Sequence, residues 1–296
     1  MAKQFYVDTR FNTASRKLIA LCEEIMAPYI TQGYTLTVRQ LYYQLVARDH
    51  IPNTERSYKN ITRLINDARL AGLIDWDWIE DRTRALKGRS AWTSGKSILQ
   101  ACVDSFHMDM WETQDCRVYL IVEKDALAGV VNVPCHRFDV PMLAARGYPS
   151  ASALRDAVVG NMLPASNSGQ SIKLLHLGDH DPSGIDMSRD LEKRIRMFGD
   201  EGMDVEFRRI ALNMPQIEEV NPPENPAKTT DTRYEEYRRL YGESSWELDA
   251  LNPEYLDALI TRHVQEFIDV DAWEARKAEI ETVRDKLRTT ARTFKL

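Results

Sequence analysis

Residues 174–187, LLHLGDHDPSGIDM, join an apolar run to a segment that holds three acidic residues, a proline and two glycines. The run IKLLHL at 172–177 is almost continuously apolar, as is VYLIV at 118–122, and such runs are typical of strands buried on both faces. Helix-like segments separate them, and MDVEFRRIAL at 203–212 predicts a further strand. This alternation predicts an α/β fold with a mainly parallel sheet.

Carboxylates directly follow two of these runs. Glu123 comes after the run at 118–122, and Asp179 and Asp181 come after the run at 172–177. Ligands of a parallel α/β sheet gather at the carboxyl ends of its strands, so we expect the three side chains to converge there. Residues two apart in an extended chain point to the same side, so Asp179 and Asp181 can share one cation. Such oxygen ligands predict a Mg²⁺ site, which would also accept Mn²⁺.

An ordinary turn is the alternative interpretation of the D-x-D-P-x-G pattern, since Asp before Pro and a following Gly supply turn chemistry without a metal. Glu123 favours the metal site, because isolated carboxylates at strand ends repel one another unless a cation is present. Asp186 and Asp190 fall on a helix expected near 185–198 and are interpreted as solvated residues. His176 lies inside a strand and is interpreted as a core residue.

The N-terminal part of the chain has helical spacing. Apolar residues recur every three or four positions over 13–31, and Thr37 is a suitable N-cap for a second helix, TVRQLYYQLVARD. A third helix is expected after residues 52–54, ending at Gly72. Together the three predict a helix-turn-helix unit. Apolar and acidic residues alternate in LIDWDWIEDRTRAL, residues 73–86, which predicts a strand that would form a wing.

Several other segments are less distinctive. The polar stretch at 84–96 is expected to be a linker before a helix near 95–111. Residues 221–232, NPPENPAKTTDT, are rich in proline and are expected to be irregular. A charged helix is expected from about residue 271.

Composition limits the function classes. The net charge of -6 and the pI near 5.6 argue against a uniformly basic surface, so any nucleic-acid contact must be a local patch. The four cysteines lack the spacing of a zinc site or a disulfide framework and are interpreted as reduced thiols. Neither a signal peptide nor an apolar run of membrane-spanning length is visible. We therefore expect a soluble cytoplasmic protein without a membrane partner.

Four motifs carry a resemblance to a known family: RQLYY at 39–43, VEKDA at 122–126, the G-Y-P stretch within AARGYPSAS, and GDHDPSGID at 178–186. VEKDA and GDHDPSGID resemble the Toprim domain. The whole order resembles the A subunit of topoisomerase VI and the related meiotic double-strand-break protein. The resemblance implies a winged-helix (CAP-like) DNA-binding domain over residues 1–112, a Rossmann-like Toprim domain over 113–270, and a C-terminal helix over 271–296.

The tyrosine pair has one member that geometry separates from the core. Val38, Leu41, Tyr42, Leu45 and Val46 form an apolar stripe, whereas Tyr43 lies off it and shares a face with Arg39. The family's nucleophile is likewise the second tyrosine, so the resemblance implies that Tyr43 attacks DNA to give a 5′-phosphotyrosyl link. Arg39 would lower the phenol pKa or hold the phosphate, and Glu123 would shuttle a proton. The resemblance also implies a homodimer, in which the tyrosine of one subunit meets the metal site of the other.

DNA contacts are expected on the third helix, where Arg56, Lys59 and Arg63 share the face opposite its apolar stripe. The resemblance implies two more, at Lys124 and Arg146. Because a solvated helix face has the same appearance, contact with phosphates of double-stranded DNA is the expectation rather than base recognition.

Departures from the family leave alternatives open. LAGVV follows VEKDA where the family has a different helix start, and alanine or arginine replaces a lysine at Ala145 and Arg146. The chain is short, resembling most the stand-alone topoisomerase mini-A proteins, so strand passage would need an ATPase partner in trans. Alternatives are a Toprim nuclease of the plasmid-defence type, which hydrolyses DNA with activated water, and a non-catalytic DNA-binding protein. Glu247 and Asp249, in WELDAL, are interpreted as structural residues.

Overall fold

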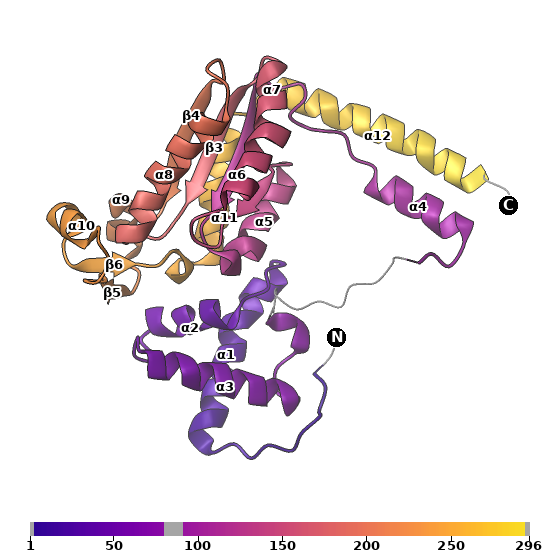
Figure 1. Cartoon of the computed structure of the whole chain (residues 1–296). Coiled ribbons are helices and arrows are strands. Elements are labelled where there is room, and N and C mark those ends of the chain that lie inside the picture. Colours follow the sequence, from indigo (N-terminus) through magenta and orange to yellow (C-terminus); the bar gives the residue numbers. More distant parts are fainter. Residues whose placement is uncertain (1–2, 80–90, 294–296) are drawn as a thin grey trace.

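The computed structural model describes residues 3–79 and 91–293. Figure 1 shows a three-helix unit, made of α1 to α3, beside an α/β unit built on a parallel sheet. The helices are α1 Thr13–Thr31, α2 Val38–Ala47, α3 Glu55–Leu70, α4 Gly95–Ser105, α5 Ala128–Arg137, α6 Ala151–Ala157, α7 Leu163–Asn167, α8 Pro182–Phe198, α9 Met214–Val220, α10 Tyr234–Tyr241, α11 Pro253–Gln265 and α12 Val270–Thr293. The strands are β1 Cys116–Val122, β2 Met142–Ala144, β3 Ser171–Leu177, β4 Val205–Ala211, β5 Glu224–Pro226 and β6 Ser244–Trp246. Short helical turns are η1 Trp76–Trp78, η2 Asp125–Leu127, η3 Val158–Met162, which is a π-helix, and η4 Leu248–Ala250.

The three-helix unit follows the sequence pattern closely. The structure confirms all three helices, and α1 has the expected bounds. Thr37 caps α2 in a capping box, in which its side chain accepts from the Gln40 backbone and the Gln40 side chain accepts from the Thr37 backbone. Thr54 caps α3, and its hydroxyl accepts from the Ser57 backbone N–H at 3.1 Å. The apolar faces of α1, α2 and α3 pack into one core, which also includes Ala250 from η4.

The expected wing strand is wrong over its described part. Trp76–Trp78 is a 3₁₀ turn, and the Asp75 side chain caps it by accepting from the Asp77 backbone at 2.9 Å. Extended pairing is limited to a single bridge between Leu36 and Ile79. The local hydrogen bond of an Asp side chain competes with strand pairing, which explains why an alternating pattern gave a turn. Residues 80–86 of the expected strand, and 84–90 of the expected linker, lie outside the described residues.

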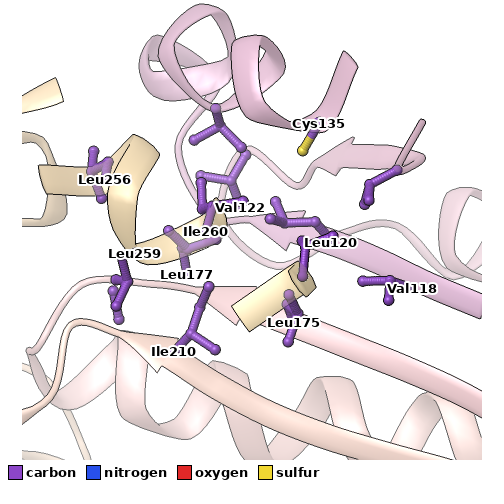
Figure 2. Close-up of a cluster of buried hydrophobic side chains, with 14 of the residues drawn as sticks. Val118, Leu120, Val122, Cys135, Leu175, Leu177, Ile210, Leu256, Leu259 and Ile260 are labelled. Atoms are coloured by element: carbon purple, nitrogen blue, oxygen red, sulfur yellow. The ribbon is translucent and has the colours of Figure 1, made fainter. Parts of the chain in front are cut away.

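The predicted parallel sheet is confirmed, with strand order β2-β1-β3-β4 and every pair parallel. Alternate residues of β1 enter different cores: Val118, Leu120 and Val122 pack on one side, and Tyr119 and Ile121 on the other. The first core contains α5 and α11, and Figure 2 shows residues of β1, β3 and β4 meeting α11 there. The second core contains α6 and α8. Helices therefore cover both faces, as a parallel sheet requires.

The last strand residues stand side by side at the carboxyl edge of the sheet. Val122 is in register with Leu177, and the Glu123 backbone N–H donates to the Leu177 carbonyl at 2.9 Å. The turn after β3 then leads into α8, which begins at Pro182. Glu123 and the acidic turn are thus neighbours because of strand register.

Two segments differ from expectation. Within residues 221–232, β5 pairs antiparallel with β6, which follows α10, and the proline-rich sequence did not indicate this strand. The helix expected near 95–111 ends at Ser105, and Figure 1 shows it lying along α12, far from α1 to α3. Across the described ranges, no helix has the length and apolar character that crossing a membrane requires.

Candidate active site

Glu123, Asp179 and Asp181 lie together at the carboxyl edge of the sheet. Glu123 Oε2 accepts from the Asp179 backbone N–H at 2.9 Å, which ties the end of β1 to the turn after β3. The charge of Asp181 acts on Glu123, and that of Glu123 acts on Asp179. The sequence predicted this convergence because all three residues follow the carboxyl ends of expected parallel strands, and the structure brings them together.

Each of the two aspartates accepts a backbone hydrogen bond through its side chain. Asp181 is the N-cap of α8, and its Oδ1 accepts from the Gly184 backbone at 2.6 Å. Asp179 Oδ1 accepts from the Leu248 backbone at 2.8 Å, and its Oδ2 pairs with Lys124 Nζ at 2.9 Å. The turn interpretation is therefore correct for the local geometry, because Asp181 does cap a helix.

An ion cluster extends from Asp179 to the three-helix unit. Lys124 Nζ lies 2.9 Å from Asp179, 2.7 Å from Glu247 and 3.0 Å from Asp249. Arg39, on α2, pairs with the same Glu247 and lies 2.6 Å from Asp249 Oδ2. Two cations from different units thus share two carboxylates. We call Arg39, Lys124, Asp179, Glu247 and Asp249 the ion cluster.

Further contacts hold the two units together. The Tyr34 hydroxyl donates to Asp257 at 2.6 Å, and Arg137 makes a bidentate pair with the same carboxylate at 2.9 and 3.0 Å. Near α3, Asn53 Nδ2 donates to the Asn225 side chain at 2.8 Å. These contacts fix α2 against η4, so the position of Arg39 is set by the packing of both units.

Tyr43 lies on the same face of α2 as Arg39, whose guanidinium is 5.8 Å from the Tyr43 ring. It was expected to lie away from the core, but it is only 5% exposed, because η4 and the ion cluster cover that face. The pKa of Tyr43 is raised, by burial first and then by Glu247 and Asp249, which outweigh Arg39 and Lys124. Arg39 does act to lower this pKa, as expected, but it does not prevail in this arrangement.

Tyr42 points elsewhere. It is 3% exposed, and its hydroxyl donates to Asn53 Oδ1 at 2.9 Å. Its ring meets those of Tyr43 and Tyr58 edge to face. The interpretation of Tyr42 as a core residue is confirmed. The two tyrosines and Arg39 line a cavity of about 220 Å³, whose other walls come from the start of α3 and from Asn225.

Glu123 and Asp179 resist ionisation, because the pKa of each carboxyl is raised. Burial raises the pKa of Glu123, and Asp181 adds to the effect. Burial likewise raises the pKa of Asp179 to about 7, with Glu123 and Asp249 contributing and Lys124 opposing. Glu247 is the exception: burial opposes its ionisation, but Lys124 and Arg39 lower its pKa to about 2. Crowded, buried acids of this kind favour the approach of a further cation.

Two of the three predicted magnesium ligands have an oxygen available to a metal ion. Within the described ranges, Glu123 Oε1 and Asp181 Oδ2 have no hydrogen-bond or ion-pair partner, whereas both oxygens of Asp179 are engaged. Among the same residues, no group of three or more His, Cys, Asp and Glu side chains is arranged to hold a metal. Mg²⁺ is commonly held by one or two carboxylates and completed by water and phosphate oxygens, so Glu123 and Asp181 suit it.

Arg209, on β4, donates hydrogen bonds to backbone carbonyls of the acidic turn. Its Nη2 donates to the carbonyls of Gly178 and Asp179 at 2.9 and 2.6 Å, and its Nη1 donates to the Gly184 carbonyl at 3.0 Å. The guanidinium is buried next to Glu123, and its positive charge opposes the rise in the pKa of that carboxyl. Arg209 therefore fixes the backbone of the turn and offsets part of its negative charge.

The predicted DNA-contact residues lie on two surfaces. Arg56, Lys59 and Arg63 are exposed on α3, where Lys59 also pairs with Glu55 at 2.7 Å. Arg146 follows β2 at the same sheet edge as Glu123 and pairs with Asp125 at 3.2 Å. Lys124 is the member that differs most from expectation, since its ammonium is enclosed by carboxylates.

Sequence reasoning gave Glu247 and Asp249 only a structural role and did not single out Arg209. Asp249 stands between Leu248 and Ala250 in a run that is otherwise buried, and its side chain has no exposed surface. An acid inside an apolar run is a usable signal, because an ionised group is buried only with a partner. The partners, however, are distant in sequence and could not be named from it.

Comparison with known proteins gives no match, either to a protein-family model or to a curated protein.

Proposed function

We propose that the chain is a Mg²⁺-dependent DNA-cleaving enzyme of the type IIB topoisomerase A-subunit kind, acting as a homodimer. The observation that carries the proposal is the shared ion cluster. Arg39, one helical turn before Tyr43, contacts Glu247 and Asp249, and these also hold Lys124 against Asp179. A nucleophile, two cations and a set of carboxylates thereby occupy one region of a single chain.

In the proposed reaction, the Tyr43 phenol oxygen attacks a DNA phosphorus. The bond from phosphorus to the 3′ oxygen breaks. The phosphate stays on the 5′ end of the cut strand, where it is now joined to the tyrosine. The phenol proton passes to a carboxylate of the ion cluster. Asp249, whose pKa burial raises, suits this role better than Glu247, whose pKa is about 2. Glu123, with its raised pKa, gives a proton to the departing 3′ oxygen.

The cations have separate tasks. Arg39 and Lys124 hold the oxygens of the phosphate that is attacked. A Mg²⁺ ion would stabilise the charge that develops on those oxygens. Asp181 and Asp179 would hold it, and Glu123 would be a further ligand only in its ionised form, once its proton has gone to the 3′ oxygen. Rejoining runs the same steps in reverse, because the 3′ hydroxyl attacks the phosphotyrosine and the phenol leaves.

Other parts of the proposal concern partners. A homodimer supplies two tyrosines, one for each strand of double-stranded DNA. Arg56, Lys59, Arg63 and Arg146 contact phosphates on either side of the cut. Strand passage would require an ATPase supplied by another protein.

A second candidate function is hydrolysis of DNA by water at the same carboxylates, without a covalent link. The burial and raised pKa of Tyr43 favour it, because a protonated and covered phenol is a weak nucleophile. The two functions differ in whether cut DNA carries protein.

The test uses the full chain with supercoiled plasmid and Mg²⁺ or Mn²⁺, followed by denaturation in detergent. We expect linear or nicked DNA with covalently attached protein, which Tyr43→Phe abolishes. Tyr42→Phe is the matched control, because it removes a neighbouring hydroxyl that bonds Asn53 and should keep adduct formation. Cleavage that survives in Tyr43→Phe without an adduct would assign hydrolysis instead. Normal cleavage by both Glu123→Ala and Asp179→Ala would refute either chemistry, and binding without cleavage would indicate a DNA-binding protein.

A further inference from the structure

The ammonium of Lys124 is surrounded by carboxylates, as a bound metal ion would be. Its ammonium lies within 3.0 Å of carboxylate oxygens from Asp179, Glu247 and Asp249, and its side chain is 17% exposed. An ammonium has three N–H donors, so three carboxylates satisfy it fully. Burial alone would lower the pKa of Lys124, but the charges of Asp249, Asp179 and Glu247 outweigh it and raise that pKa.

Asp179 is the carboxylate that the lysine shares with the proposed metal site. Its Oδ1 is held by the Leu248 backbone, so Oδ2 is the oxygen that could reach a metal, and Oδ2 pairs with Lys124. Glu123 and Asp181 each keep one oxygen without such a partner in the described ranges. The lysine therefore withholds one of three ligands.

The charge balance of the region favours exchange of this lysine for a divalent ion. Around the turn, Arg39, Lys124 and Arg209 face Glu123, Asp179, Asp181, Glu247 and Asp249, so three cations meet five carboxylates. Glu247 and Asp249 keep Arg39 when the lysine leaves. A lysine has a flexible stem, so its ammonium can turn toward a phosphate and leave Asp179 Oδ2 to the metal.

We propose that Lys124 is a tethered counter-ion that competes with a divalent metal for Asp179. When Lys124 turns toward a DNA phosphate, Asp179 completes the metal site with Glu123 and Asp181. This inference rests on the proposed function, because it assumes that the metal binds at those carboxylates. It makes full metal binding depend on the presence of a phosphate.

The test measures Mn²⁺ affinity and stoichiometry of the full chain by calorimetry, without DNA. Lys124→Met should bind Mn²⁺ about tenfold more tightly than the parent chain, since partners of ligating groups change metal affinity by such factors. Adding Asp179→Asn to Lys124→Met should remove the gain. The matched control is Lys173→Met, which removes a lysine of similar exposure that pairs with Glu206 on the sheet.

Outcomes separate the two proposals. If the parent chain binds Mn²⁺ and Lys124→Met binds it no more tightly, the counter-ion role is refuted and the metal site stands. If neither binds Mn²⁺, both the metal site and the counter-ion role are refuted. If Lys124→Met fails to fold, a double variant that combines it with Asp249→Asn replaces it in the test. The double variant removes one charge of each sign, and we expect it to show the same gain in Mn²⁺ affinity. Equal affinity in that folded double variant would refute the role of Lys124.

Discussion

His176 is a buried imidazole that the proposed reaction does not use. It lies inside β3, where Nδ1 shares a hydrogen bond with Ser188 Oγ at 3.0 Å and the ring lies 5.8 Å from that of Phe207. Its interpretation as a core residue is confirmed, since it has no exposed surface. Burial, with the charge of Arg209, lowers its pKa to about 3. The folded chain therefore excludes a proton that the unfolded chain accepts.

We predict that His176 makes the fold sensitive to acid. An imidazole in the unfolded chain titrates near pH 6.5, so its contribution to stability is complete above that pH and is lost as the pH falls toward 3. At pH 5 the parent chain should have lost about 2 kcal/mol of unfolding free energy that His176→Leu retains. Urea unfolding at pH 7.5 and pH 5 measures the difference. His136→Gln, at the exposed end of α5, is the control, and an equal loss in His176→Leu would contradict the prediction.

Single residues were predictable from sequence where one chemical preference dominates. Glu123 and Asp179 follow buried strands, and strand ends in a parallel sheet converge whatever else the chain does. Glu247 and Asp249 carried no such signal, because their roles come from Arg39 and Lys124, which lie more than a hundred residues earlier. The low exposure of Tyr43 could not be predicted for a similar reason. The apolar spacing of a helix does not show which of its polar faces will be buried by another part of the chain.

At the level of elements, the start of α8 packs closely against the acidic turn that precedes it. Asp181 caps the helix, Pro182 begins it, and Gly184 lies under the Asp179 carbonyl. A Cβ on Gly184 would lie 2.2 Å from that oxygen and 3.1 Å from Glu123 Oε2. The close approach of helix and turn thus depends on the missing side chain.

We predict that Gly184→Ala moves α8 away from the acidic turn. The clash is with backbone, which cannot rotate aside, so we expect a loss of about 1–3 kcal/mol in unfolding free energy, as for other overpacked sites. Mn²⁺ affinity should fall as well, because Asp181 moves with the helix. Gly160→Ala is the control, since a Cβ there meets nothing within 4 Å. Parent-like stability and Mn²⁺ affinity in Gly184→Ala would show that the turn tolerates the displacement.

Elements were predictable when a local pattern and the tertiary fold agreed. α1 and the three long strands follow from the spacing of apolar residues, and the same residues are buried when the elements pack together. The described part of the expected wing failed because Asp75 caps a turn locally, and a side-chain hydrogen bond of that kind is cheaper to form than a distant strand pair. The antiparallel pair of β5 and β6 was missed because strands of three residues are too short to show a hydrophobic period.

The whole molecule is organised by the contact between its two units. Arg39, Tyr34 and Asn53 of the three-helix unit each bond to the α/β unit of the same chain. The core of the three-helix unit even includes Ala250 from η4. Tyr43 therefore belongs to the surroundings of its own chain's carboxylates.

We predict that tyrosine and carboxylates act within one chain. The family resemblance implies the opposite arrangement, in which subunits exchange them. Co-expression of Tyr43→Phe with Asp179→Ala tests this directly, because exchange between subunits would rebuild one intact site in each mixed dimer. We expect no cleavage from the mixture, while each variant paired with the parent chain keeps single-strand nicking. Restored nicking in the mixture would assign the site to two chains.

The sequence positions of the ion cluster also set an order in time. Arg39 and Lys124 leave the ribosome well before Glu247 and Asp249, and 125 residues separate Lys124 from Asp249. At roughly 5–20 residues per second, Lys124 is made about 6–25 seconds before Asp249, and Arg39 about 10–40 seconds before it. During synthesis the three-helix unit can complete its helices but lacks Ala250 and the partners of Arg39. The ion cluster can therefore form only after the chain as far as Asp249 has been made.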